Sequence, residues 1–206
     1  MTQRKIKPVS DNLEKQQTYA KNMARYNSAM SQGFYFEALV IDYAMIEDRL
    51  RSMLYHMAML KDRKQIKLWN QTKDKLYVMA TFNGTGKPRY SATTLSGKLA
   101  IVREAILWAT GVTEGYGNDR YLTALKLQIE SLDADALLQT MDAIVQWKDY
   151  RNEIIHSLLN KNVDSIVEKA AEVALQGMQL ARELDAHERL MKKGHTIRRS
   201  CGLTTE

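Results

Sequence analysis

Arg151, Asn152 and His156 are the residues of this 206-residue chain whose types and spacing best suit chemistry. Imidazole accepts and donates protons near neutral pH, and a guanidinium carries a permanent charge on a fork of donors that fits phosphate. An amide beside the imidazole could orient it or contact a ribose or phosphate oxygen. Together the three groups suit attack of a ribose 2′-hydroxyl on its adjacent phosphate without a metal ion.

The spacing Arg-x-x-x-x-His has little specificity, because the chain repeats it at Arg51–His56 and at Arg182–His187. The Arg151 copy differs in having Asn next in sequence and an apolar stripe around the arginine. At about 100° per residue, five apolar residues fall within about 60° of Arg151, namely Ile144, Trp147, Ile154, Ile155 and Leu158. The alternative for this copy is a buried ion-pair and capping cluster. We expect the other two pairs, and His195, to lie on solvated surface.

On the same helical wheel His156 lies about 140° from Arg151, on the side of Asn152. Asn152 and His156 are four residues apart and can touch on one helix face. Arg151 and His156 do not share a face. A long arginine stem, a distorted helix or a second copy of the helix would be needed to bring them together, and a dimer would also explain an arginine on an apolar stripe.

Two segments of the chain resemble HEPN (higher eukaryotes and prokaryotes nucleotide-binding) domains. The stretch WKDYRNEIIHSLL, residues 147–159, resembles their signature of Arg, a polar residue, a short spacer and His. The stretch EALVIDYAMIEDRLRSML, residues 37–54, is similar to their opening helix. The resemblance covers roughly residues 34–60 and 99–190, and it leaves the segment between them unaccounted for.

The resemblance implies an all-α bundle that acts as a metal-independent endoribonuclease, although some members of the family only bind. It implies a homodimer in which two motif helices form a composite site, with Arg151, Asn152 and His156 as the catalytic residues. An acidic residue of the opening helix sometimes assists, and Glu47 or Asp48 would be the candidate. Any antitoxin or regulatory partner would be a separate protein, and toxin–antitoxin systems, phage defence and RNA processing all remain open as biological roles.

The distribution of apolar residues predicts a single all-α domain over residues 11–193. Only Pro8 and Pro88 could interrupt helices. Helical periodicity indicates a bundle of about five helices, over residues 34–60, 99–108, 119–131, 135–160 and 163–193, and a weaker helix before them over residues 11–30. Residues 1–10 are expected to be a flexible arm and residues 194–206 a flexible basic tail.

Residues 61–98 are predicted to form a loop-rich insertion after the first long helix. They contain nine basic and two acidic residues, a net charge of +7 against +6 for the whole chain. Aromatic residues Trp69, Tyr77, Phe82 and Tyr90 are interleaved, as in surfaces that bind single-stranded nucleic acid. The candidate RNA-binding residues are Lys64, Lys67, Lys73, Lys75, Lys87 and Arg89. The alternative is a solvated loop whose aromatic rings pack on the bundle.

Other functional classes have weaker support in the sequence. Residues 83–88, NGTGKP, lack the spacing of a Walker phosphate-binding loop, and Pro88 stands where its helix would begin. No cluster of His, Asp, Glu or Cys has metal-ligand spacing, so we expect no metal and no cofactor. No apolar run is long enough to span a bilayer, and the single Cys201 cannot form an internal disulfide, so we expect a cytoplasmic protein that is not membrane-bound.

Two functional hypotheses follow. The first is a homodimeric endoribonuclease that uses Arg151, Asn152 and His156, with RNA held by the insertion. The second is a non-catalytic helical protein that binds nucleotide or RNA, or that regulates another subunit. A metal-dependent hydrolase is disfavoured.

Overall fold

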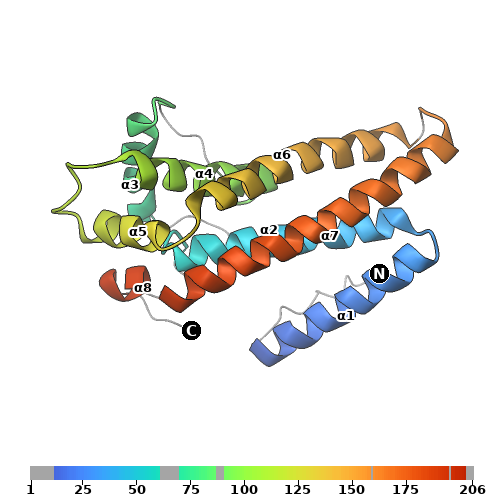
Figure 1. Cartoon of the computed structure of the whole chain (residues 1–206), viewed down its shortest axis with the longest axis horizontal. Coiled ribbons are helices and arrows are strands. Elements are labelled where there is room, and N and C mark those ends of the chain that lie inside the picture. Colours follow the sequence, from blue (N-terminus) through green and yellow to red (C-terminus); the bar gives the residue numbers. More distant parts are fainter. Residues whose placement is uncertain (1–11, 61–69, 87–90, 159, 195, 203–206) are drawn as a thin grey trace, which may run out of the picture.

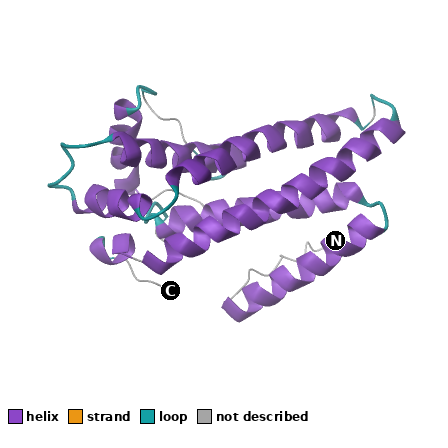
Figure 2. Cartoon of the chain, viewed as in Figure 1, coloured by secondary structure: helices purple, strands orange, loops and turns teal. Residues whose placement is uncertain are grey.

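The computed structural model describes residues 12–60, 70–86, 91–158, 160–194 and 196–202. Within these ranges the chain forms eight helices and no strand (Figure 2). The all-α prediction is therefore confirmed, but the prediction of about five helices is too low. The helices are α1 (Asn12–Ser31), α2 (Tyr35–His56), α3 (Asn70–Phe82), α4 (Leu95–Gly111), α5 (Arg120–Glu130), α6 (Ala134–Ser157), α7 (Val163–Gly194) and α8 (Thr196–Ser200).

The three long helices α2, α6 and α7 run side by side along the molecule (Figure 1). Helix α7 packs on both α2 and α6, and α1 lies along the outer side of α2. Helices α3, α4, α5 and α8 gather at the end of the bundle where α6 begins. The turn between α6 and α7 forms the opposite end, so the last turn of α6 lies far from α3.

Side-chain caps fix where three of the helices begin. Thr94 accepts a hydrogen bond from the backbone N–H of Gly97 at the start of α4. Asp119 accepts from two N–H groups at the start of α5, and Asp133 accepts from Ala136 at the start of α6. These bonds satisfy donors that the first turn of a helix leaves unpaired.

The predicted loop over residues 61–98 is wrong for residues 70–82 and 95–98, which form helix α3 and the start of α4, whereas residues 83–86 and 91–94 are turns and loop. Leu76, Met79 and Ala80 are buried and fix α3 against α4. Helix α4 begins at Leu95 rather than at residue 99. A Cβ on Gly97 would lie 1.9 Å from the carbonyl oxygen of Ser91, so the first turn of α4 depends on glycine for this close approach.

The basic tail also differs from expectation between residues 196 and 202. Helix α8 docks on the bundle with Ile197 and Arg198 buried. The Arg198 guanidinium donates to the carbonyl oxygens of Tyr55 and Leu60 at 3.1 and 3.0 Å, and it lies 3.7 Å from the centre of the Tyr55 ring. Arg198 was expected to be part of a flexible basic tail, but its guanidinium instead binds carbonyl groups at and just beyond the end of α2. The arm over residues 1–10 lies outside the described residues.

Candidate active site on helix α6

Packing on α7 positions the C-terminal half of α6, which holds the predicted site. Ile144, Trp147 and Ile154 are buried along this side of α6. The Trp147 indole donates to the carbonyl oxygen of Val173 at 2.8 Å, which ties the middle of α6 to α7. The residues that follow Trp147 are therefore carried on a rigid helix rather than on a loop.

Arg151 is half-buried between α6 and α2. Its guanidinium carbon lies 5.0 Å from the centre of the Tyr43 ring, and it donates to the Asn152 side-chain oxygen at 3.2 Å. Its buried Nε has no hydrogen-bond partner among the described residues. No carboxylate of the described chain forms an ion pair with Arg151, so its positive charge is held by a ring face and an amide alone.

His156 is exposed on the last turn of α6. It forms no hydrogen bond or ion pair with another residue in the described parts of the chain. Asn152 and His156 could touch on one helix face, but in the described chain they form no hydrogen bond, and the Asn152 oxygen accepts from Arg151. Arg151 and His156 are therefore not brought together within one chain, in agreement with their positions on the helical wheel.

Charged residues around the motif are mostly paired with one another. Glu153, exposed between Asn152 and His156 in sequence, binds Lys161 at 3.0 Å and Lys169 at 3.2 Å. These hydrogen bonds lower the pKa of Glu153 and link α6 to the start of α7. Lys148 binds Ser96 at the start of α4. The charged residues of α6 nearest to Arg151 and His156, namely Lys148, Asp149 and Glu153, thus already have partners.

The acidic residues expected to assist are both engaged elsewhere. Glu47 forms a 2.7 Å ion pair with the buried Lys98. Asp48 binds Lys15 at 2.9 Å and accepts a 2.7 Å hydrogen bond from Tyr19. Within the described residues, neither carboxylate forms an ion pair or hydrogen bond with the α6 motif, and both instead join α2 to neighbouring helices.

Sequence reasoning missed a different acid of α2. Asp42 is completely buried, and neither of its carboxylate oxygens has a hydrogen-bond partner in the described chain. Burial raises the pKa of Asp42 to about 8. A Cβ on Gly177 of α7 would lie 2.8 Å from both Asp42 Oδ2 and Trp147 Nε1. The signal in the sequence is a lone acid within the apolar run ALVIDYAMI, residues 38–46.

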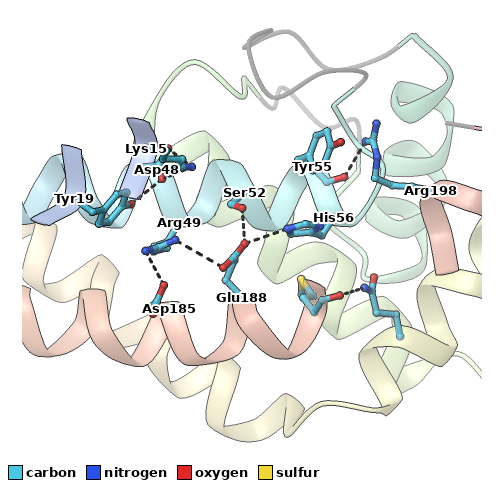
Figure 3. A network of polar contacts seen from close by, with 12 residues as sticks. Lys15, Tyr19, Asp48, Arg49, Ser52, Tyr55, His56, Asp185, Glu188 and Arg198 are labelled. Carbon is cyan, nitrogen blue, oxygen red and sulfur yellow. Dashed lines mark hydrogen bonds and ion pairs between the residues drawn. The ribbon is translucent and has the colours of Figure 1, made fainter. Parts of the chain in front are cut away.

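The prediction of an exposed Arg51–His56 pair is wrong, because α7 covers His56. His56 is 1% exposed, and its Nε2 lies 3.1 Å from Glu188 Oε1 (Figure 3). Ser52 donates to the same oxygen at 2.6 Å, and Arg49 approaches the other carboxylate oxygen at 3.8 Å. Sequence reasoning missed this network because its two halves lie on α2 and α7, more than a hundred residues apart.

Ser52, His56 and Glu188 do not form a nucleophile–base–orienter chain. The serine hydroxyl donates to Glu188 Oε1, and His56 Nε2 lies 3.1 Å from the same oxygen, so the serine proton is directed at the carboxylate rather than at the histidine. Burial alone would raise the pKa of Glu188, but the hydrogen bonds from His56 and Ser52 lower it to about 2. The arrangement is that of a buried carboxylate held ionised between helices, a structural role.

The third copy of the spacing, on α7, is partly exposed. Arg182 is exposed, as predicted, whereas His187 is half-buried with its Nε2 3.5 Å from the Thr140 hydroxyl. Burial lowers the pKa of His187. His195 lies outside the described residues. Of the three histidines that the structure describes, His156 is the exposed one.

Two of the six predicted RNA-binding residues lie within the described chain. Lys73 is exposed on α3, on the same helix face as the exposed ring of Tyr77 four residues later. Lys75 forms an ion pair with Asp119. Lys64, Lys67, Lys87 and Arg89, together with Trp69 and Tyr90, lie outside the described residues.

Helix α3 and the last turn of α6, which carries His156, lie at opposite ends of the bundle (Figure 1). The 24 residues of α6 that separate these ends span about 36 Å. RNA held on α3 would therefore have to run along the bundle, or belong to a neighbouring copy, to reach His156.

The NGTGKP segment has a structural explanation where it is described. The Asn83 amide donates to the Glu104 carboxylate at 2.6 Å, and the Thr85 hydroxyl bonds to the same carboxylate at 3.2 Å. These contacts fasten the end of α3 to α4. Lys87 and Pro88 lie outside the described residues.

Within the described ranges, no group of three or more His, Cys, Asp or Glu residues is placed to hold a metal ion. No described helix has the length and apolarity needed to cross a membrane. Comparisons of the chain with protein-family models, with curated proteins and with solved structures found no match.

Proposed function

We propose that this protein is a metal-independent endoribonuclease whose site uses Arg151, Asn152 and His156 of two copies of α6. One observation carries the proposal: His156 is exposed and without a partner in the described chain, five residues from an arginine that no described carboxylate neutralises. The two groups that RNA cleavage needs, a proton acceptor and a fixed cation, are thus available to a ligand.

In the proposed reaction His156 takes the proton of a ribose 2′-hydroxyl, and the 2′-oxygen attacks the adjacent phosphorus. The bond to the 5′-oxygen of the next nucleotide breaks, and that oxygen takes a proton from an acid, for which His156 of a second copy is the candidate. The products are a 2′,3′-cyclic phosphate and a 5′-hydroxyl. Arg151 binds the phosphate as negative charge grows on it, and Asn152 holds the guanidinium in place.

A second copy of the chain follows from the geometry of one α6. Because Arg151 and His156 point about 140° apart, a single helix cannot direct both at one phosphate. Exposed apolar side chains flank His156 and would give a second copy something to bury, namely Tyr150, Leu158 and Val163. Lys73 and the exposed rings of α3 would then extend the contact with RNA.

Incubation of purified protein with labelled single-stranded RNA in EDTA tests this function. The wild-type chain should cleave, leaving cyclic phosphate ends, and His156→Ala should cleave at least 100-fold more slowly. His187→Ala is the matched control, since it removes a half-buried histidine of the same spacing and should retain activity. No cleavage by the wild-type chain, or equal cleavage by His156→Ala, would refute the proposal.

The second candidate is a non-catalytic RNA- or nucleotide-binding or regulatory protein. It is favoured by one observation, that Arg151 lies against Tyr43 and Asn152 within its own chain rather than toward His156. This candidate would be supported if RNA binds the wild-type chain in EDTA and remains intact, and if Arg151→Ala weakens that binding.

A further inference from the structure

A charged cleft separates α1 from α7 above the middle of α2, apart from the α6 motif. Its volume is about 510 Å³, within the range of small-molecule sites. Lys15 and Tyr19 form its α1 side, Arg49 and Ser52 its floor on α2, and residues 181–192 of α7 contribute the remaining wall. Figure 3 shows Lys15, Tyr19, Arg49 and Ser52 around the polar network at its base.

The acids at this cleft are already neutralised within the chain. Asp185 binds Arg49 at 2.7 Å and Arg189 at 2.8 Å. Glu188 lies at the base with Arg49, Ser52 and His56, as described above, and Asp48 binds Lys15 beside the cleft. Lys15, Arg49 and Arg189 therefore offset these three carboxylates, and among the described residues of the lining each carboxylate has a cationic partner.

Two cations of the lining remain uncompensated. Arg182 and Lys192 are exposed on α7, and neither forms an ion pair within the described chain. They are ten residues apart, so their Cα atoms are separated by about 15 Å along the helix axis. A single orthophosphate is small compared with this separation. An elongated anion with more than one charged group can contact both side chains at once.

The cleft offers charge but little surface for stacking a base. Tyr19 is the aromatic residue among the described residues of the lining. The Arg49 guanidinium lies 4.3 Å from the centre of its ring and covers one face of that ring. Single-stranded nucleic acid sites rely on exposed ring faces along a groove. The observations therefore favour a small polyphosphate over an RNA strand.

We infer that the cleft between α1, α2 and α7 binds a small ligand bearing two or more linked phosphate groups, with Arg182 and Lys192 as its principal contacts. Arg182 supplies a fork of donors for phosphate oxygens, and Lys192 supplies a mobile point charge at the other end. Arg189 lies between them along α7 and Lys15 lies on α1, and both also line the cleft while paired with Asp185 and Asp48. This site is independent of the proposed ribonuclease activity.

Isothermal titration calorimetry on the full chain at about 150 mM salt tests the inference, with inorganic tripolyphosphate as the probe and orthophosphate for comparison. Tripolyphosphate should bind and orthophosphate should bind at least tenfold more weakly. Arg182→Gln with Lys192→Gln should weaken tripolyphosphate binding about tenfold or more. The matched control is Lys21→Gln with Lys193→Gln, which removes the same charge from exposed residues outside the cleft and should leave binding within about twofold.

Absence of tripolyphosphate binding to the wild-type chain would overturn the inference. Equal weakening by the two double variants would do the same, because it would show general attraction to a basic protein. A single-stranded RNA that binds the cleft in preference to tripolyphosphate would also overturn it. The RNA-cleavage comparison of His156→Ala with the wild-type chain is unaffected by any of these results, so the two proposals fail separately.

Discussion

Helices α2 and α6 contain the same Arg-x-x-x-x-His spacing but give it opposite surroundings. On α2, His56 is buried beneath α7 and shares the ionised Glu188 with Ser52. On α6, His156 is exposed without a partner in the described chain, and Arg151 has a ring and an amide in place of a carboxylate. Spacing along a helix thus fixes which residues share a face, but the neighbouring helix decides whether they are buried in the fold or left exposed.

Removal of the Glu188 carboxylate, which binds Ser52 and His56 of α2, should have the largest effect on stability. Glu188→Ala leaves His56 and Ser52 buried without their acceptor and should lower the free energy of unfolding by about 3 kcal/mol or more, measured by urea denaturation. Glu183→Ala, on the same helix but in an exposed hydrogen bond with Gln179, is the control and should cost less than about 0.5 kcal/mol. Equal effects of the two substitutions on unfolding free energy would show that the contacts of Glu188 with Ser52 and His56 do not stabilise the fold.

The two buried acids should give opposite dependences of stability on pH. The folded-state pKa of Glu188 is lowered from 4.5 to about 2, so its contribution is present above pH 4.5 and is lost as pH falls toward 2. The folded-state pKa of Asp42 is raised from 3.8 to about 8, so stability is lost as pH rises between these values.

Asp42→Asn isolates the second of these effects. The variant should be more stable than the wild-type chain at pH 8, by on the order of 3 kcal/mol, and the gain should shrink as pH falls toward 4. Denaturation curves at several pH values measure the difference. A constant difference across this range would show that Asp42 does not titrate between the folded and unfolded states as its burial requires.

Arg151 should have a smaller structural effect than either buried acid. Arg151→Ala removes the contact with Tyr43 and should lower the free energy of unfolding by about 1 kcal/mol. Arg151→Lys keeps the charge but loses the fork of donors, so it should recover most of the stability and little of the RNA cleavage. Full recovery of cleavage by lysine would indicate that Arg151 acts as a point charge rather than by paired hydrogen bonds.

The long helices could be predicted from sequence because their apolar periodicity is local and proline is scarce. The boundaries of α6 and α7 match the predicted ranges within three residues at each end. Helix α3 was not predicted, because its buried Leu76, Met79 and Ala80 are few and lie beside the glycine-rich segment that follows. Local composition there resembles a loop, and only packing on α4 reveals the helix.

The roles of buried polar residues could not be predicted, since they depend on partners distant in sequence. His56 meets Glu188 across 132 residues, and Arg198 meets the Tyr55 carbonyl across 143 residues. The separation of Arg151 from His156 could be predicted, because it follows from helical geometry within one element. The opposite positions of α3 and His156 could not, because they depend on how the helices pack.

The division of roles between α2 and α6 is tested most directly by measuring unfolding free energy and metal-free RNA cleavage on His56→Ala and His156→Ala together. We predict that His156→Ala changes stability by less than about 0.5 kcal/mol and slows cleavage at least 100-fold. His56→Ala should lose about 2 kcal/mol or more and retain cleavage per folded molecule. Wild-type cleavage by His156→Ala, or an unchanged stability of His56→Ala, would contradict this division.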